Sequence, residues 1–268
     1  MGSFIGHFLP GFTFTLVSLW WMLAISAQQA INPRAFRNRA SHPWPGRRLS
    51  PETWLKIIIS PIGIIGEAYT AFEDGRFSHL GNLQHMTMYT FFLISGIIDL
   101  WSARKSIGRR LPPGSDFAAI IVAAMVEWLL FRFHLHGRDP LDVLVHTLLG
   151  FTIVAIVLIV LAECVFRESV LLGYMRAIAV LTHGLWFISV GYILHNPWGP
   201  PPFDANDHGS HMVATCIFTW HVLVATLICG FIVVATHKKF GTGSIETEYT
   251  RCPEREEAAL KGFENDDF

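Results

Sequence analysis

Long apolar segments alternate with short polar ones along the whole chain. About 20 apolar residues in a helix cross a hydrocarbon core of roughly 30 Å. The segments that reach this length are Phe4–Ala27, Trp54–Phe72, Leu80–Trp101, Asp116–Leu135, Asp142–Phe166, Val170–Leu194 and His211–Thr236. The second is the weakest, because Pro61 and Glu67 interrupt it. The pattern predicts an all-α integral membrane protein, with a seven-transmembrane-helix bundle over residues 1–236 and a polar tail over residues 237–268.

The composition narrows the class of protein further. Of the 268 residues, 51% are hydrophobic and only 15% are charged, whereas about 25% of the residues in a soluble domain are charged. This balance excludes a disordered chain and argues against an ordinary soluble globule. The formal net charge of −1 gives no basic field for binding nucleic acid. The four cysteines form no CxxC pair, so they indicate neither a thiolate zinc motif nor a disulfide framework.

Lys and Arg are concentrated in alternate connections between the predicted spans. Outside the spans, nearly all Lys and Arg residues lie in the first, third and fifth connections and in the tail. The connections on the opposite side of the membrane have only Arg76 and Arg138. Basic loops remain on the cytosolic side of a membrane. The sequence therefore predicts an outer or lumenal N-terminus and a cytosolic tail.

Ionisable residues also occur inside the predicted spans, where a charge costs at least about 2.5–3.5 kcal/mol and so faces a cavity or a partner. Counting about 1.5 Å per residue from the outer end of each span places them at one level, in the outer half of the membrane. The candidate metal ligands are Glu67, His85, Glu127, His146 and His221. Imidazole and carboxylate together are a ligand set typical of zinc. We therefore expect a divalent metal, zinc by preference, with Asp142 and His7 at the rim of the site.

Two alternatives to a zinc site use the same side chains. Mutual hydrogen bonds can satisfy buried His and Glu side chains as a structural or proton-relay network, and a haem or other cofactor pocket also uses histidine. Asp142 and His146 illustrate the choice, because they share one helical face. This spacing suits a carboxylate behind a metal-bound imidazole, but Asp142 is equally suited to capping the helix.

Short motifs in a fixed order extend from residue 6 to residue 221. They are GHFLPG at Gly6–Gly11, GIIGE at Gly63–Glu67, LQHMTMY at Leu83–Tyr89, SGIIDL at Ser95–Leu100, Val126-Glu127, HLHGRDPLDVLVH at His134–His146, THGLWFISVGYIL at Thr182–Leu194 and Trp220-His221. In this ordered set the chain resembles the transmembrane protein 45 family. The resemblance implies a seven-helix membrane protein of the Golgi, another endomembrane or the plasma membrane, but no reaction. His183 stands where the family has a glutamine-like residue, so the resemblance supports the five candidate ligands better than it supports His183.

Three classes of function fit these observations. The first is a metal-binding membrane protein, in its enzymatic form a metal-dependent hydrolase acting on lipid, which needs an open coordination position. The second is a proton or metal-ion transporter that uses the same His and Glu, although the inner half offers few polar groups to continue a path. The third is a trafficking or scaffold protein whose polar layer only fixes helix packing. The sequence identifies no catalytic residue and no partner beyond the lipid bilayer, and it leaves homo-oligomer formation open.

Overall fold

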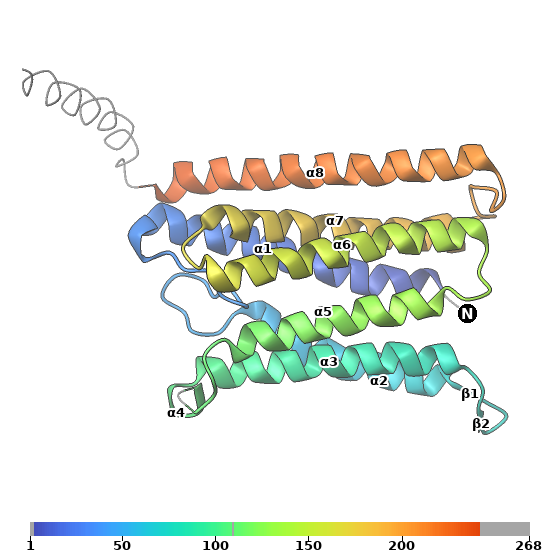
Figure 1. The fold of residues 1–268 in the computed structure, drawn as a ribbon, viewed down its shortest axis with the longest axis horizontal. Coiled ribbons are helices and arrows are strands. Elements are labelled where there is room, and N and C mark those ends of the chain that lie inside the picture. The colour runs from blue at the N-terminus through green and yellow to red at the C-terminus, as the bar shows by residue number, and fades with distance from the viewer. Residues whose placement is uncertain (1–2, 109, 242–268) are drawn as a thin grey trace, which may run out of the picture.

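The computed structural model describes residues 3–108 and 110–241, which are helical almost throughout (Figure 1). The long helices are α1 (Phe4–Ile31), α2 (Pro51–Thr70), α3 (Leu80–Ala103), α5 (Ser115–His134), α6 (Pro140–Val165), α7 (Val170–His195) and α8 (His208–Phe240). The short elements are η1 (Pro33–Ala35), α4 (Lys105–Gly108) and a hairpin of β1 (Phe72–Glu73) and β2 (Arg76–Phe77). Helix α8 continues past residue 237, the predicted start of the tail, and residues 242–268 of that tail lie outside the described part.

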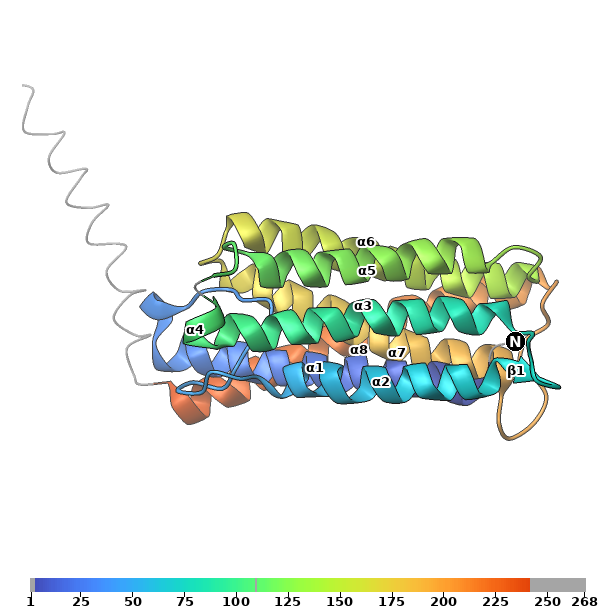
Figure 2. The ribbon, with the colours of Figure 1, turned by 90° about the horizontal axis from the view of Figure 1, so that it is seen from below.

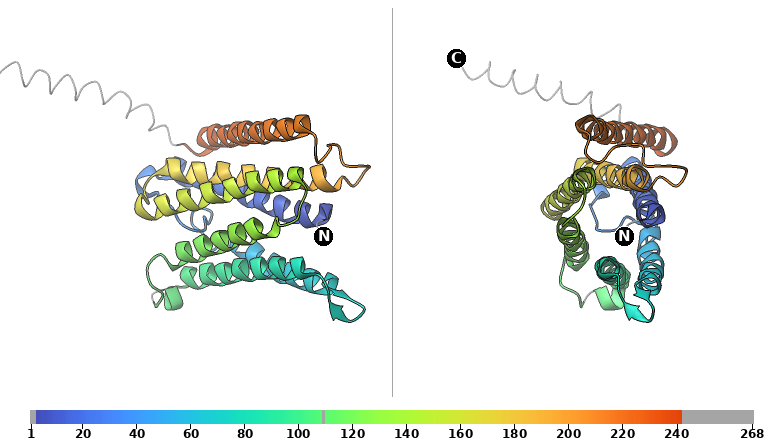
Figure 3. Two further views of the ribbon diagram at one scale, coloured as in Figure 1. Left: turned by 45° about the vertical axis from the view of Figure 1, so that its right-hand side comes forward. Right: turned by 90° about the vertical axis from the view of Figure 1, so that its right-hand side faces the viewer.

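The long helices run side by side with alternating directions, so their connections gather at two ends of the bundle (Figure 1 and Figure 2). The N-terminal end holds the start of α1, the β-hairpin, the α5–α6 loop and the α7–α8 loop. The opposite end holds the α1–α2, α3–α5 and α6–α7 connections, which are the basic ones. Helix α1 packs on α7, α2 on α3, and α8 covers α1 and α7 from outside (Figure 3).

Among residues 3–108 and 110–241, six helices have the length and apolar composition of membrane spans, namely α1, α3, α5, α6, α7 and α8. Their outward faces are apolar, since Phe151 of α6 is 63% exposed and Phe231 of α8 is 74% exposed. Water-soluble monomers rarely expose such large apolar surfaces. Helix α2 is long enough but less apolar, in keeping with Pro61 and Glu67 inside it. The all-helical, multi-pass architecture is confirmed, and the count of seven spans stays a prediction.

Helices α1 and α7 approach closely because glycine lies at their contact. A Cβ atom built on Gly184 would lie 2.7 Å from the amide nitrogen of Thr15 and 2.8 Å from the carbonyl oxygen of Gly11. A Cβ atom on Gly191 would lie 2.8 Å from the Cβ of His7. Small residues permit this approach between membrane helices. The contact fixes the position of α1 along the axis of α7 and so positions His7.

Replacing Gly184 by Val is expected to lower the free energy of unfolding by about 1–3 kcal/mol, because the new side chain meets the backbone of α1. Thermal unfolding of the detergent-solubilised protein measures the effect. Gly66→Val is the matched control, since nothing lies within 4 Å of a Cβ built on this helical glycine. Parent-like stability of the Gly184→Val protein would contradict the close contact of α1 with α7.

The segment between α1 and α2 folds over the opposite end and is held there by Arg176 of α7. The Arg176 guanidinium donates to the carbonyl oxygens of Arg39 and Ala40 at 2.8 and 3.3 Å. It also lies 3.3 Å from a carboxylate oxygen of Glu163 and 4.4 Å from the ring centroid of Trp21. The side chains of Arg176 and Glu163 are 1% and 0% exposed. One buried ion pair therefore joins α1, α6, α7 and this connection.

His42 of the same connection is fully buried, and burial lowers its pKa, with the charges of Arg176 and Arg39 adding to the effect. The folded protein therefore holds a neutral imidazole, whereas the unfolded chain takes up a proton below about pH 6.5. The contribution of the neutral His42 imidazole to the free energy of unfolding is complete above that pH and is lost as the pH falls below it. We expect His42 to remove up to about 1.4 kcal/mol from the free energy of unfolding per pH unit below about 6.5.

Thermal unfolding at about pH 7.5 and about pH 5.5 tests this pH dependence. The His42→Leu variant should lose less stability on acidification than the parent. The exposed His208 provides the control, because His208→Leu should lose as much as the parent. Equal losses in the parent and in the His42→Leu variant would show that His42 is protonated in the folded state as readily as in the unfolded chain.

Candidate functional site

Polar side chains form a continuous series of contacts across the N-terminal end of the bundle. The series starts with Glu67 of α2 and His85 of α3, whose Oε1 and Nδ1 atoms are 3.1 Å apart. Asn82 donates to the carbonyl oxygen of Glu67 at 3.0 Å and joins the same two helices. The His85 ring centroid is 5.6 Å from that of His134, which carries the series to α5.

His134 and Arg138 connect α3 and α5 to the start of α6. Because arginine can only donate, the Nε2 atom of His134 accepts from the Arg138 guanidinium at 2.7 Å. The Nδ1 atom of His134 then donates to Oε1 of Gln84 at 2.7 Å. Arg138 also donates to Oδ2 of Asp142 at 3.1 Å. A positive φ of 75° at Gly137 allows the sharp turn between the helices.

His146 lies one turn beyond Asp142 and contacts it as the sequence spacing predicted. Its Nδ1 atom is 2.8 Å from the Asp142 carboxylate and 2.9 Å from the Asp142 carbonyl oxygen. Both oxygens are acceptors only, so Nδ1 carries the proton, which it donates to the carbonyl oxygen, and Nε2 presents a lone pair. A carboxylate behind an imidazole fixes the tautomer that binds metals. His146 is therefore buried in a ligand-ready state.

Two further histidines continue the series, because His7 of α1 stands beside His146 and His195 of α7 stands beside His7. The ring centroid of His7 is 5.7 Å from that of His146 and 5.4 Å from that of His195. The Nδ1 atom of His7 donates to the carbonyl oxygen of Ser3 at 2.9 Å, so its Nε2 atom presents a lone pair. The Nε2 atom of His195 is buried without a hydrogen-bond partner in the described part of the chain. We call His7, His146 and His195 the histidine cluster.

Glu127 of α5 contacts a different histidine, His183 in the middle of α7. Glu127 Oε1 and His183 Nε2 are 3.5 Å apart, and both side chains are buried. On its other side, His183 Nδ1 donates to the Thr152 hydroxyl at 2.7 Å, and that hydroxyl donates to the Leu149 carbonyl at 2.6 Å. Glu127 Oε1 and His183 Nε2 make no hydrogen bond with the described residues. This arrangement is a buried polar contact between α5, α6 and α7 that is hydrogen-bonded on the Thr152 side.

His221 of α8 is engaged at the contact between α7 and α8. Its Nδ1 atom donates to the carbonyl oxygen of Ile217 at 2.7 Å, and its Nε2 atom accepts from the Ser189 hydroxyl at 2.9 Å. The ring packs edge-on against Trp186, with centroids 5.7 Å apart. Both ring nitrogens of His221 are thus hydrogen-bonded, Nδ1 within α8 and Nε2 to Ser189 of α7.

Of the five predicted ligands, Glu67 and His85 contact each other, whereas Glu127, His146 and His221 lie in three other contacts. Their partners are His85 for Glu67, His183 for Glu127, Asp142 for His146 and Ser189 for His221. Among residues 3–108 and 110–241, no three His, Cys, Asp or Glu side chains are arranged as around a bound metal. The sequence pattern did not single out His195, because the predicted span ends at Leu194. Extending the depth comparison by one residue would have placed His195 at the level of His7.

Comparisons with known proteins place these features in context. Residues 113–234, from just before α5 into α8, match the family described as "Family of unknown function (DUF716)". The chain is 24% identical to transmembrane epididymal protein 1 of Rattus norvegicus, over 85% of this chain and 78% of that protein. It is 25% identical to transmembrane epididymal protein 1A of Mus musculus with the same coverage. With transmembrane epididymal protein 1 of Homo sapiens the identity is 25%, over 56% of this chain and 54% of that protein.

Six apolar helices of spanning length, together with relatives named as transmembrane proteins, identify an integral, multi-pass membrane protein. Its surface therefore contacts the lipid bilayer. The finer resemblance to the transmembrane protein 45 family stays a prediction, and so does residence in the Golgi, another endomembrane or the plasma membrane.

Proposed function

We propose that this multi-pass membrane protein binds a divalent metal ion, zinc by its ligand chemistry, in the histidine cluster. The spacing of the His146 and His195 rings from the His7 ring carries the proposal. Imidazoles that bind one tetrahedral zinc through bonds of about 2.0–2.1 Å have ring centroids about 5 Å apart. The His7 ring lies 5.7 Å from the His146 ring and 5.4 Å from the His195 ring. Both spacings from the His7 ring are close to this value, so we propose that the three Nε2 atoms turn toward one metal ion when it binds.

The hydrogen bonds around the cluster support the same conclusion. Asp142 behind His146 and the Ser3 carbonyl behind His7 hold two of the rings with Nε2 unprotonated. Such outer partners orient metal ligands and raise their basicity. The buried Nε2 atom of His195 lacks a protein partner in the described residues, which a metal would supply. Three imidazole ligands leave a fourth position for water or substrate, as in catalytic zinc sites.

Of the five ligands predicted from the sequence, the proposal retains His146 alone. Glu67, Glu127 and His221 instead contact His85, His183 and Ser189 between neighbouring helices. The series of contacts crosses the N-terminal end of the bundle and does not follow its length. This direction favours binding at one level over a path for protons or metal ions through the membrane.

We also propose that α2 is a seventh span and that the N-terminus is outside or lumenal. The α1–α2 connection and the β-hairpin lie at opposite ends of the bundle (Figure 1), and basic connections stay in the cytosol. In sealed microsomes, an epitope tag inserted after Gly46 should be digested by added protease, and a tag after Gly75 should be protected. The same outcome at both positions would show that α2 does not span.

The metal proposal is tested on protein purified in detergent without a chelator. Elemental analysis should find about one zinc per chain, and chelator-treated protein should rebind zinc in a competition titration. The triple variant His7→Gln/His146→Gln/His195→Gln should lose this binding. The matched triple variant His85→Gln/His134→Gln/His221→Gln removes the same number of imidazoles and should retain it.

Thermal unfolding and size-exclusion chromatography of both triple variants distinguish a lost ligand from a lost fold. Zinc binding that survives the first triple variant would place the metal elsewhere. Absence of zinc binding by a folded parent at micromolar zinc would leave the cluster as a hydrogen-bonded network and reject the proposal.

A further inference from the structure

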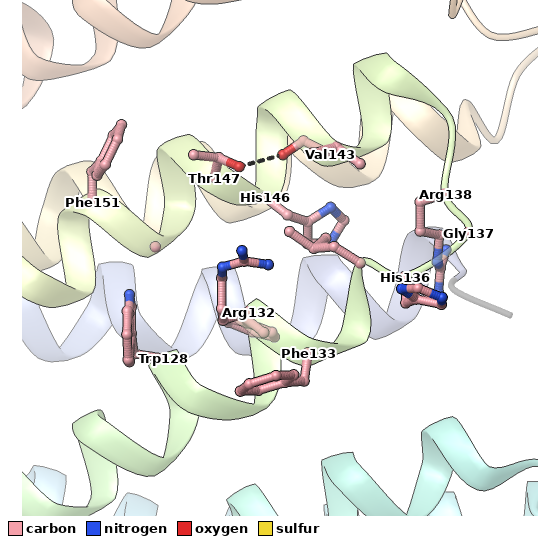
Figure 4. A pocket seen from close by; sticks show the side chains of 13 residues that line it. Trp128, Arg132, Phe133, His136, Gly137, Arg138, Val143, His146, Thr147 and Phe151 are labelled. Carbon is pink, nitrogen blue, oxygen red and sulfur yellow. Dashed lines mark hydrogen bonds between the residues drawn. The ribbon is translucent and has the colours of Figure 1, made fainter.

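A pocket of about 730 Å³ lies between α5 and α6 near the N-terminal end (Figure 4). Its volume is within the range of about 300–1,000 Å³ that small-molecule sites occupy. Part of its wall faces outward, since Phe133 is 70% exposed and Phe151 is 63% exposed. Both helices are candidate membrane spans. The pocket is therefore accessible from the lipid bilayer.

The two ends of the pocket differ in polarity. Figure 4 shows Trp128 and Phe151 at one end and His136 and Arg138 at the other, with Arg132 between them. Arg138 is paired with Asp142. Arg132 takes part in none of the ion pairs formed by residues 3–108 and 110–241. Arg132 is thus a cation without a paired anion beside the apolar end of the pocket. An amphiphile with an anionic head group and an apolar chain is complementary to this arrangement.

We propose that this pocket binds a long-chain fatty acid taken from the bilayer, with its carboxylate at Arg132 and its chain along Trp128 and Phe151. The planar guanidinium fork of arginine matches a carboxylate with two parallel hydrogen bonds. The lining extends along α6 from Val143 to Phe151, about 12 Å at the helical rise of about 1.5 Å per residue, so the pocket holds the carboxylate and the first part of the chain, and the rest of the chain passes the exposed Phe151 into the bilayer. A pocket of this volume accommodates one acyl chain more readily than the two chains of a phospholipid.

The position of Arg132 fits this orientation. It lies in the last turn of α5, where long basic side chains reach the membrane–water boundary. The carboxylate of a fatty acid in a bilayer occupies the same boundary, so the ligand can enter sideways without leaving its usual depth. The inference does not rest on the metal site, because the pocket shares only His146 with the histidine cluster.

The test is photocrosslinking of a fatty acid with a diazirine in its chain to the protein in nanodiscs, with unlabelled oleate as competitor. Label should map to peptides from residues 128–151. Arg132→Gln should weaken oleate competition at least about tenfold, because a charge-assisted hydrogen bond is lost. Thr147→Trp, which fills the pocket from an exposed lining position, should also reduce labelling.

Matched controls separate a pocket from a general lipid surface. Thr226→Trp alters an exposed threonine of α8 whose hydroxyl donates to the carbonyl four residues earlier, as that of Thr147 does. Arg104→Gln removes an exposed arginine at the opposite end. Both control variants should crosslink and compete like the parent. Equal labelling of Thr147→Trp and Thr226→Trp would overturn the proposal.

Competitors define the head group. Oleyl alcohol should compete at least about tenfold less well than oleate, since it lacks the charge. Equal competition would reject recognition of a carboxylate, and stronger competition by oleoyl lysophosphatidate would reject a fatty acid in favour of a phosphate ester. The His7→Gln/His195→Gln variant should lose zinc but keep oleate binding, so failure of either proposal is recognised separately.

Discussion

Replacing His195 by Gln is expected to lower the zinc affinity of the protein by more than about 100-fold, because one of three ligands is removed. Asp142→Asn keeps every ligand but weakens the acceptor behind His146, and such outer changes typically cost about 10–100-fold. A competition titration against a chromophoric chelator measures both variants.

His221→Gln is the control for this series. It removes an imidazole from the neighbouring helix α8, where both ring nitrogens of His221 are hydrogen-bonded, and it should leave zinc affinity unchanged. An equal loss in His221→Gln and His195→Gln would mean that zinc responds to general loosening of the bundle. Parent-like affinity of His195→Gln would exclude His195 as a ligand.

Arg176→Met is expected to lower the free energy of unfolding by about 3–5 kcal/mol, the range for breaking a buried ion pair. The substitution leaves the Glu163 carboxylate buried without its cation. It also removes the donor to the carbonyl oxygens of Arg39 and Ala40. Denaturant titration of the protein in detergent measures the change.

Two comparisons identify the cause of that loss. In Arg176→Met/Glu163→Leu the orphaned charge is removed as well, so most of the stability should return. The pair of Arg37 and Glu168 has a 2.9 Å contact but is 66% and 76% exposed, so Arg37→Gln should cost about 0–1 kcal/mol. Similar losses for Arg176→Met and Arg37→Gln would refute the structural role assigned to the buried pair.

The positions of the helices could be predicted from the sequence, because a membrane span needs about 20 apolar residues. The observed helices Leu80–Ala103 and Ser115–His134 begin within a residue of the predicted spans. The ends were less predictable. Helix α1 continues past Ala27 to Ile31, and α8 continues past Thr236 to Phe240. Backbone hydrogen bonding extends a helix beyond its apolar segment. The hydropathy of the side chains therefore does not mark the residue at which the helix ends.

The level of the polar residues was also predictable, whereas their lateral partners were not. Depth follows from the helical rise alone, and it placed His7, His85 and His146 near one end, as observed. The pairing of Glu127 with His183 depends on the rotation of each helix and on which helices are neighbours. These are set by contacts such as that of Gly184 with α1. A hydropathy pattern along one chain contains no information on such contacts.

The packing of α1 on α7 has a consequence for how the protein is made. Roughly 140 residues separate the end of α1 from the start of α7, and a ribosome adds about 5–20 residues per second. Helix α1 therefore enters the membrane roughly 7–28 s before its main partner is synthesised. During that interval His7 and Ser18, which the finished protein buries against α7, must be shielded by the insertion machinery or by the helices already made. A chain truncated before residue 170 lacks the partner of α1. Its insertion into the membrane should accordingly be impaired more than that of a chain that lacks any other single helix contact.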